Sequence, residues 1–518
     1  MSVMECMKEK VKKWLKTPDF YFYVVFVILS LAFTQLIIEK NDRLNLAIPI
    51  LLTVFVVEVL MLYLLVRVRR KGWPLEKMFL LVATVLGIMF IILLPPGQAP
   101  DDGAHFSRAY GVADGVILAY PVTENENYSG VGSSLPEEVH VMLTTDNVRG
   151  TYKQKLKWAL QGSSGNVKDT VYNGSALYSP LCYLPQVIGA LIGRLFGMSV
   201  MGIAYLMEIF NFVAWLFLVY FGIKLLPKFK KMAILVALLP ITLQEATSLS
   251  PDALTIGFAI LLVGYVMNLA YARKGNLKKW DYILLAVIAI MIGMCKIVYV
   301  PLLLLYFTIP AERFGSKKRK WIALAVILGI AGIINFAWLL ISSNTLLQSH
   351  IDSVDPKAQV KYILGAPIEY VGTMFRTVEW ETTFWLHTML GSTLGWLSIK
   401  LPDTIFYITF GIMLILIAQR DERLKIKVFD RVMYIASFVS ILLLILTSLY
   451  LQWTPVGGDK VGGIQGRYFL PILALIPVMI CRTNDKIPHM NLITENKIFC
   501  YGIVINMLAF VTFFVQNL

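Results

Sequence analysis

Two adjacent carboxylates, Asp101 and Asp102, stand directly after a proline and shortly after a long apolar run. Proline suits the first helical position, and acids there face the positive end of the helix dipole, so a helix is predicted to begin here. In that helix Asp101, His105 and Arg108 share one face, and Asp102 lies near His105.

Backbone N–H groups and the dipole favour the charged form of an acid in this position. An ionised pair at a membrane surface could take a proton from a hydroxyl, or Asp101 and Asp102 could hold a divalent metal such as Mg or Mn. The alternative is a capped juxtamembrane helix whose acids only satisfy its first turn.

Further polar residues stand at the ends of apolar segments, outside the basic loops. They are Tyr178, Glu245, Asp252, Lys296, Glu379, Trp380, Gln465, Arg467 and Tyr468. Each has an ordinary interpretation: Ser250 to Asp252 is typical of a helix N-cap, Arg467 and Tyr468 of an interfacial anchor, and Glu379 with Trp380 of a solvated turn in an aromatic belt. Polar groups at a membrane edge are costly to leave unpaired, so their joint occurrence predicts one shared site.

These residue types suit one kind of chemistry. A carboxylate can act as general base on an acceptor hydroxyl, arginine and lysine can hold a leaving phosphate, and aromatic rings can stack on a sugar. Transfer of a sugar from a lipid-linked phosphate needs this set. HExxH, Walker, GxSxG and GxGxxG contexts are missing from the sequence, which disfavours proteolysis and nucleotide-driven work.

The elements that must position these groups are membrane spans. Of the 518 residues, 57% are hydrophobic and only 15% are charged, whereas a soluble protein carries about a quarter charged residues. Apolar runs recur and are continuous rather than alternating, so the predicted fold class is an all-α polytopic membrane protein and not a β-barrel. The net charge of +14 indicates the orientation of the chain in the membrane rather than nucleic-acid binding, because the basic residues cluster in short loops. Five cysteines without paired spacing support neither disulfides nor a zinc site.

About thirteen transmembrane helices are predicted, with the N-terminus inside. The predicted spans are 20–38, 46–66, 77–94, 200–223, 232–249, 252–271, 280–294, 297–310, 321–342, 403–418, 431–451, 467–481 and 499–516. The basic loops assigned to the inside are the N-terminal lysines and 67–71, 224–231, 273–279, 313–320, 420–427 and 482–486.

This topology leaves two large loops outside, 96–199 and 343–402, which we expect to form a cap. It requires that 178–197 does not cross the membrane but is interfacial or re-entrant, as its prolines and glycines suggest. Spans 280–294 and 297–310 are short, with Lys296 at the turn between them. The alternative is one bent helix with a snorkelling lysine.

Three motifs in this order resemble a known family. They are Pro100-Asp101-Asp102-Gly103-Ala104-His105-Phe106, Leu249-Ser250-Pro251-Asp252-Ala253-Leu254 and Gln465-Gly466-Arg467-Tyr468-Phe469-Leu470-Pro471. Together they resemble a bacterial family of predicted membrane proteins that carries a domain of unknown function and is grouped with the GT-C glycosyltransferases. The resemblance implies a GT-C-like membrane domain over residues 77–518, with residues 1–76 as a two-span addition.

The resemblance also implies an activity. GT-C enzymes use sugars linked to polyprenyl phosphate or diphosphate at the outer face, and an acid in the first outward loop is their general base. Asp101 would be that base, Asp102 would position the acceptor or a metal, and Arg467 with Lys296 would hold the donor phosphate. The other residues above, with His105 and Arg108, are expected to bind substrate.

We therefore expect an inverting glycosyltransferase, multi-pass in a bacterial plasma membrane, with its active site facing outside. Its partners would be a polyprenyl-phosphate-linked sugar donor, a cell-wall or lipid-linked glycan acceptor and membrane lipid, but no nucleic acid. One alternative is a transporter or flippase of a lipid-linked glycan, which predicts ionisable groups deep in the membrane, such as Glu58 and Glu208. Another is a glycan polymerase or ligase that does not depend on an Asp pair.

Overall fold

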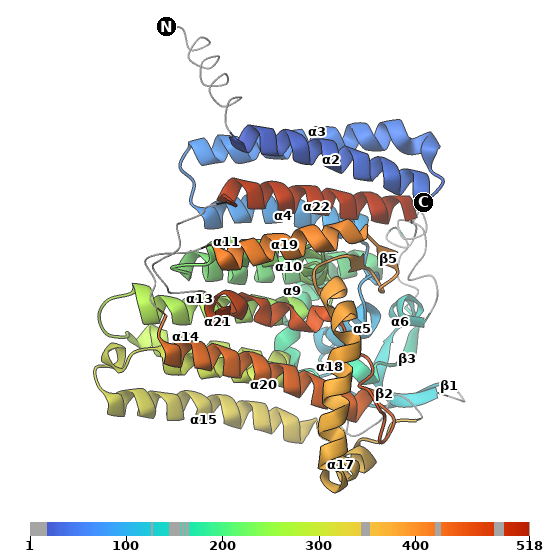
Figure 1. The fold of residues 1–518 in the computed structure, drawn as a ribbon. Helices are drawn as coiled ribbons and strands as arrows, with labels where there is room; N and C mark the ends of the chain where they lie inside the picture. Colours follow the sequence, from blue (N-terminus) through green and yellow to red (C-terminus); the bar gives the residue numbers. More distant parts are fainter. Residues whose placement is uncertain are drawn as a thin grey trace.

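The chain forms a mostly helical structure whose long helices lie side by side (Figure 1). The computed structural model describes residues 18–125, 128–144, 157, 160, 165–342, 353–419, 426–480 and 492–516. Eight helices within these ranges are long and apolar enough to cross a membrane. They are α2 (Pro18–Lys40), α3 (Ala47–Arg70), α4 (Leu75–Leu93), α10 (Val200–Leu225), α13 (Asp252–Met267, continued by η4, Asn268–Ala272), α15 (Lys317–Ile341), α20 (Val428–Trp453) and α22 (Glu495–Gln516). The prediction of a polytopic helical membrane protein is confirmed.

The remaining predicted spans correspond to shorter or interrupted helices. They are α11 (Lys230–Ala237) with α12 (Pro240–Ala246), α14 (Lys279–Cys295), η5 (Ile297–Thr308), α19 (Asp403–Ala418) and η7 (Gly466–Leu475) with α21 (Ile476–Ile480). The predicted span 232–249 is broken because Pro240 lacks an N–H and begins a new helix. Lys296 is extended between α14 and η5 and turns inward, so it does not snorkel. The number of thirteen crossings stays a prediction.

A cap stands at one end of the long helices, built from the first predicted outward loop. It contains α5 (Asp102–Ala113), α6 (Glu137–Thr144), α8 (Asn173–Ala176), η3 (Pro180–Tyr183), α9 (Leu184–Leu195) and the strands β1 (Tyr120–Asn125), β2 (Tyr128–Pro136) and β3 (Val167–Val171). The strands form an antiparallel sheet in the order β1-β2-β3. Residues 145–156 of this loop lie outside the described residues.

The sheet corrects the all-α prediction. Val131, Ser133 and Leu135 of β2 alternate onto a buried face that packs against Phe106 and Tyr110 of α5. This alternation of buried and exposed residues is short and lies among glycines and serines, so the sequence gives only a weak strand signal here.

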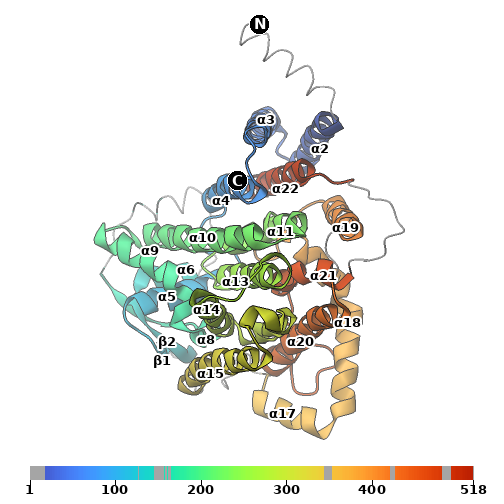
Figure 2. The ribbon, with the colours of Figure 1, turned by 90° about the vertical axis from the view of Figure 1, so that its left-hand side faces the viewer.

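The second outward loop supplies two helices and a small hairpin. Helices α17 (Pro356–Gly365) and α18 (Pro367–Met389) lie at one edge of the bundle (Figure 2), and α18 crosses the direction of the long helices near their cap ends (Figure 1). The hairpin pairs β4 (Thr393–Leu394) with β5 (Ile399–Lys400). Two further 3-10 turns, η1 (Leu44–Leu46) and η6 (Ala311–Phe314), connect spans.

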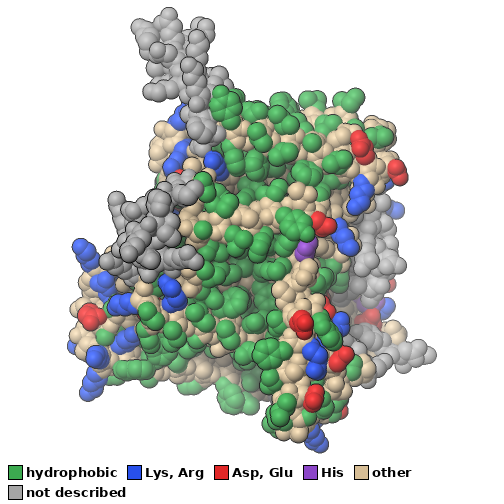
Figure 3. Space-filling model, in the orientation of Figure 1, with side chains coloured by type: hydrophobic (Ala, Val, Ile, Leu, Met, Phe, Trp, Pro, Cys, Tyr) green, Lys and Arg blue, Asp and Glu red, His purple; other side chains and the backbone are tan. Residues whose placement is uncertain are grey.

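Basic side chains gather at the end of the bundle opposite the cap, on the left in Figure 3. The ends of α3, α10, η4 and η6 and the start of α15 meet there. The predicted basic loops therefore share one side where the structure describes them. The basic residues before residue 18, at 420–425 and at 482–486 lie outside the described residues.

The helix that supports the centre of the site, α13, is held by close backbone packing. A Cβ atom on Gly264 would collide with the carbonyl oxygen of Gly222 in α10, so the two helices approach as closely as glycine allows. Helix α13 is buried along most of its length. This packing fixes Asp252, its first residue, at the cap end of the bundle.

Candidate functional site

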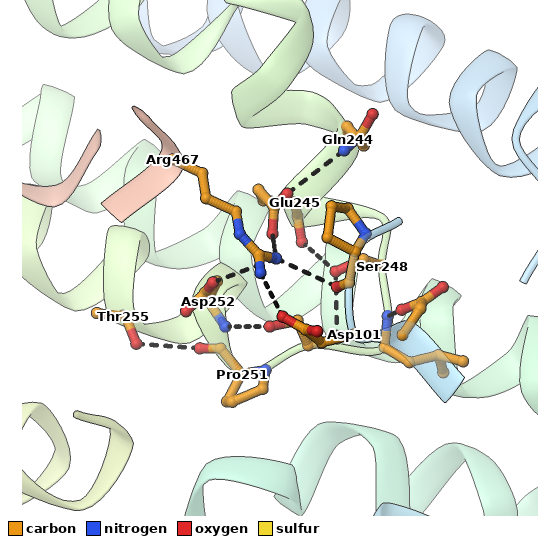
Figure 4. Close-up of polar contacts among 12 residues, drawn as sticks. Asp101, Gln244, Glu245, Ser248, Pro251, Asp252, Thr255 and Arg467 are labelled. Atoms are coloured by element: carbon orange, nitrogen blue, oxygen red, sulfur yellow. Dashed lines mark hydrogen bonds and ion pairs between the residues drawn. The ribbon is translucent and has the colours of Figure 1, made fainter. Parts of the chain in front are cut away.

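Three carboxylates and two cations meet beneath the cap. Figure 4 shows the contacts of Arg467, at the centre, with Asp101, Glu245 and Asp252. Arg467 Nη2 lies 2.5 Å from Asp101 Oδ2, and Nη1 lies 3.4 Å from Glu245 Oε2 and 3.9 Å from Asp252 Oδ2. Nη1 also donates to the carbonyl oxygen of Pro100 at 3.2 Å. Four segments distant in the sequence thus converge, at residues 100–101, 245–252, 296 and 467, counting Lys296, which pairs with Asp252. This convergence confirms that the three sequence motifs share one place.

Asp101 is the most accessible carboxylate of the cluster, with 45% of its side chain exposed. It sits just before α5 in the left-handed region, at φ 63° and ψ 4°, an uncommon conformation for a residue other than glycine. Burial raises the pKa of Asp101, but the charge and hydrogen bond of Arg467, together with the charges of His105 and Lys296, outweigh it and hold the pKa below its usual value. The carboxylate therefore stays ionised at neutral pH, through Arg467 rather than through the helix dipole alone.

Lys296 completes the cluster from the junction of α14 and η5. Its ammonium pairs with Asp252 Oδ1 and lies 5.1 Å from the ring centroid of Tyr468. Its side chain is 15% exposed, against 4% for Arg467. The hydroxyl of Tyr299 donates to the backbone carbonyl oxygen of Tyr468 at 2.8 Å. This bond holds the backbone of Tyr468 in place near the lysine. Lys296 is therefore the more accessible of the two cations.

A cavity of about 330 Å³ opens beside this cluster. Asp101, His105, Tyr178, Asp252, Lys296, Arg467 and Tyr468 line its polar part. Two candidate spans, α15 and α20, also line it, through the apolar side chains of Leu339, Ile445 and Leu449 and through several polar ones. The cavity lining thus combines a charged cluster with apolar side chains of membrane helices.

His105 and Tyr178 form the cap side of the cavity. Nδ1 of His105 lies 2.7 Å from the hydroxyl of Tyr183, and its ring meets that of Tyr178 edge-on at 5.1 Å. Burial lowers the pKa of His105 to about 4, despite the charges of Asp101 and Asp252, so the imidazole is neutral at pH 7.

Asp102 and Arg108 are turned away from the cavity. The Asp102 carboxylate accepts hydrogen bonds from the backbone N–H of Gly97 at 2.8 Å and of Leu249 at 2.7 Å. The guanidinium of Arg108 donates to the carbonyl oxygens of Val116, Ile117 and Tyr178. The helix begins at Asp102 and Asp101 is left-handed, so Asp101, His105 and Arg108 do not form the single face expected. Asp102 instead holds the cap to the bundle through Leu249, and Arg108 ties segments of the cap to one another.

Four other predicted residues do not line the cavity. Glu245 lies behind Arg467, fully buried. Glu379 and Trp380 are exposed on α18, because this segment is a helix rather than a turn. Gln465 precedes η7, and its buried Oε1 has no hydrogen-bond partner among the described residues. Of these four, only Glu245 belongs to the charged cluster.

The loop between α12 and α13 is held by amides that sequence reasoning missed. Asn211 donates to the carbonyl oxygens of Ser248 and Ser250, and Gln186 donates to that of Leu249. The sequence signal was a polar amide within an apolar helix. Ser250 accepts from the N–H of Asp252 at 3.2 Å, so the predicted capping role of this serine coexists with the ionic role of Asp252.

The cavity wall contains further residues that sequence reasoning missed. Asn335 and Trp338 of α15 reach it from a predicted span, and Gln452 reaches it from the last turn of α20, one residue beyond the predicted span 431–451. Trp338 Nε1 donates to the carbonyl oxygen of Leu177 at 2.9 Å and so ties α15 to the cap. Asn335 and Gln452 are amides within apolar runs, the same signal as Asn211.

The acidic residues do not form a metal site. Within the residues that the structure describes, no group of three or more His, Cys, Asp or Glu side chains lies close enough to hold a metal ion. Asp101 pairs with a guanidinium, and Asp102 is occupied by backbone N–H groups. This donor set does not fit the Mg or Mn considered from the sequence, and we derive no step through a metal.

Comparison with known proteins identifies a family. The family model described as "Predicted membrane protein (DUF2142)" matches residues 84–476, which include Asp101, Lys296 and Arg467 and leave α2 and α3 outside. Searches of the curated proteins and of the solved structures gave no match. The match covers well over half of the chain and all three motifs, and the chain therefore belongs to the DUF2142 family of predicted membrane proteins.

Proposed function

We propose that this protein is a membrane glycosyltransferase of the GT-C type, which moves a sugar from a polyprenyl-phosphate donor onto a cell-envelope glycan at the outer face of a bacterial plasma membrane. The observation that carries the proposal is the cavity itself. An accessible, ionised carboxylate and a lysine line the same cavity as apolar side chains of membrane helices.

Asp101 has the geometry and charge of a general base. Its carboxylate is half exposed in the cavity, and Arg467 holds it through Oδ2. An acceptor hydroxyl would attack the anomeric carbon of the donor sugar while its proton passes to Asp101. The bond between that carbon and the donor phosphate oxygen breaks in the same displacement, which inverts the anomeric configuration.

Lys296 is the better of the two candidates for the leaving phosphate. Arg467 is already surrounded by Asp101, Glu245 and a carbonyl oxygen and is nearly inaccessible. Lys296 is more exposed and can exchange Asp252 for a phosphate oxygen. Arg467 therefore acts as a positioning residue that aligns Asp101, a change from the donor-binding role expected for it.

The apolar wall fits a lipid-linked donor. Ile297 and Val298 of η5 and Ile445 and Leu449 of α20 line the cavity beside the lysine. A donor with a charged phosphate and an isoprenoid chain matches this division, because its two parts need environments of opposite polarity.

The transporter alternative has less support from the cavity. Glu58 lies in α3 and accepts a hydrogen bond from Ser30 of α2 at 2.5 Å, and Glu208 lies in α10. Neither lines the cavity. The transporter alternative expects ionisable groups such as Glu58 and Glu208 along a path through the membrane, and these two residues are not connected to the charged cluster through the cavity.

The test uses purified protein in lipid nanodiscs, a panel of radiolabelled polyprenyl-phosphate sugars and membrane extract as acceptor. We expect Asp101→Asn to lose about 10²-fold or more of transfer, the usual contribution of a general base. Asp403→Asn is the control, since Asp403 is an exposed acid outside the cavity lining. Equal transfer by wild type and Asp101→Asn refutes the mechanism. If the protein moves a lipid-linked glycan across the membrane of a liposome, and Asp101→Asn moves it at the same rate, the transporter is supported.

A further inference from the structure

Helices α17 and α18 expose a line of large apolar side chains. Val360 and Leu364 are four residues apart on α17, and Ile368, Val371 and Phe375 are spaced by three and four on α18, so each set shares one helix face. These five side chains are between 43% and 84% exposed. We call them the apolar stripe.

The rest of the surface of α18 is divided as in an amphipathic helix. Successive helical residues turn by about 100°, which places Glu369, Arg376 and Thr383 on a polar flank beside the stripe. The third side is buried, where Thr373 and Thr377 face the loop that follows α20. Over residues 367–376 the helix thus has a protein side, a polar side and an uncovered apolar side, and the exposed Glu379 ends the apolar side one turn after Phe375.

Contacts with α20 fix the level of this helix pair relative to the candidate spans. The hydroxyl of Tyr370 lies 2.6 Å from Thr447 Oγ1, and the rings of Tyr370 and Tyr450 lie 5.8 Å apart. Thr447 is six residues before the end of α20, which is about 9 Å at 1.5 Å per residue. The beginning of α18 therefore lies beside the last turns of a span.

The apolar stripe continues the apolar surface of the spans. Leu443 of α20 and Phe336 and Leu340 of α15 are exposed, and Figure 3 shows hydrophobic side chains across the long helices up to α18. In Figure 2, α17 and α18 run along the edge of the bundle, next to α20. The apolar stripe and the exposed faces of the spans therefore form one continuous apolar surface.

We propose that α17 and α18 are an interfacial anchor whose apolar stripe inserts among the lipids of the leaflet on the cap side. The occupant of the stripe is the lipid that surrounds α15 and α20. An amphipathic helix of this kind lies in the plane of the membrane with its apolar face at the boundary between headgroups and acyl chains.

The anchor is joined to the charged cluster through η7. Thr388 Oγ1 of α18 accepts from the N–H of Gly466 at 3.0 Å, and the rings of Trp385 and Phe469 lie 5.3 Å apart. The depth of α18 in the leaflet thus sets the depth of Arg467. This inference holds whatever reaction the cavity performs, so it does not rest on the proposed function.

Spin labels measure the depth directly. A nitroxide is attached to a single cysteine at Ile368, Val371 or Phe375, with Glu369 on the polar flank as the matched control, in nanodiscs of phosphatidylcholine and phosphatidylglycerol. Cys182, Cys295 and Cys500 are buried, and Cys6 and Cys481 are replaced by serine. Collision rates with oxygen and with a water-soluble nickel chelate then give the depth of each label.

The stripe labels should collide with oxygen more than with nickel and lie about 5–10 Å below the lipid phosphates, whereas the label at residue 369 should favour nickel. Nickel-accessible labels along the stripe would mean that it faces water. Low collision rates with both reagents would mean that protein, such as a second copy of the chain, covers it. Either result overturns the proposal. Unchanged thermal unfolding of the labelled variants shows that the fold is kept.

Discussion

Replacement of Arg467 by methionine tests whether this guanidinium holds the charged cluster together. Methionine keeps much of the length of the side chain and removes its charge and all its donors. Glu245, which is fully buried, then loses its ion pair with Arg467, and Asp252 keeps only Lys296. The substitution therefore leaves the buried carboxylate of Glu245 without its cationic partner.

The expected loss follows from the burial of each partner. Arg467 is 4% exposed and Glu245 is 0% exposed, and breaking a buried pair of this kind destabilises a protein by about 3–5 kcal/mol. The bond with Asp101 adds less, because that carboxylate is half exposed and the solvent screens the pair. The loss should therefore come mainly from Glu245 and not from Asp101.

A double-mutant cycle separates these contributions. Unfolding by denaturant in one detergent, followed by tryptophan fluorescence, gives the stabilities of wild type, Arg467→Met, Glu245→Gln and the double variant. The neutral amide should recover part of the loss, with a coupling free energy on the order of 1–3 kcal/mol. Lys460→Met is the matched control: its ion pair with Glu381 at 3.0 Å is more exposed and should be worth less than about 1 kcal/mol.

Two results would refute this reasoning. If Arg467→Met destabilises no more than Lys460→Met, the cluster does not depend on the guanidinium. If the effects of Arg467→Met and Glu245→Gln simply add, the two side chains are not energetically coupled.

Three further predictions concern the same region. The pKa of His105 is lowered to about 4 in the folded state, so on acidification the unfolded state takes up the proton first. The free energy of unfolding should therefore fall as the pH drops from about 6.5 to about 4. His105→Gln should flatten this part of a curve of unfolding free energy against pH. Asp102→Ala leaves two buried backbone N–H groups unpaired and should lower the free energy of unfolding by about 2–5 kcal/mol, whereas Asp101→Asn should change it by less than about 1 kcal/mol; equal losses in denaturant unfolding would contradict the division of roles. Gly466→Ala places a Cβ against the backbone of α18 and should destabilise by about 1–3 kcal/mol, which a lowered melting temperature would report and an unchanged one would exclude.

The sequence by itself determined the class of the protein and the residues of its charged cluster. Long apolar runs and basic loops require a polytopic helical membrane protein, because hydrocarbon tolerates only segments whose backbone groups are satisfied internally. The cost of polar groups at a membrane edge was enough to identify Asp101, Asp252, Lys296 and Arg467. These inferences depend on local composition, which can be read along the chain.

Tertiary structure decided which of those residues face the cavity and which support it. Asp101 and Asp102 are adjacent and chemically alike, yet one is half exposed beside Arg467 and the other is occupied by two backbone N–H groups, one from the nearby Gly97 and one from the distant Leu249. Arg108 has the same residue type as Arg467 but is used by carbonyl oxygens of the cap. No spacing rule separates these pairs, because a side chain's role depends on partners that only the folded chain brings near.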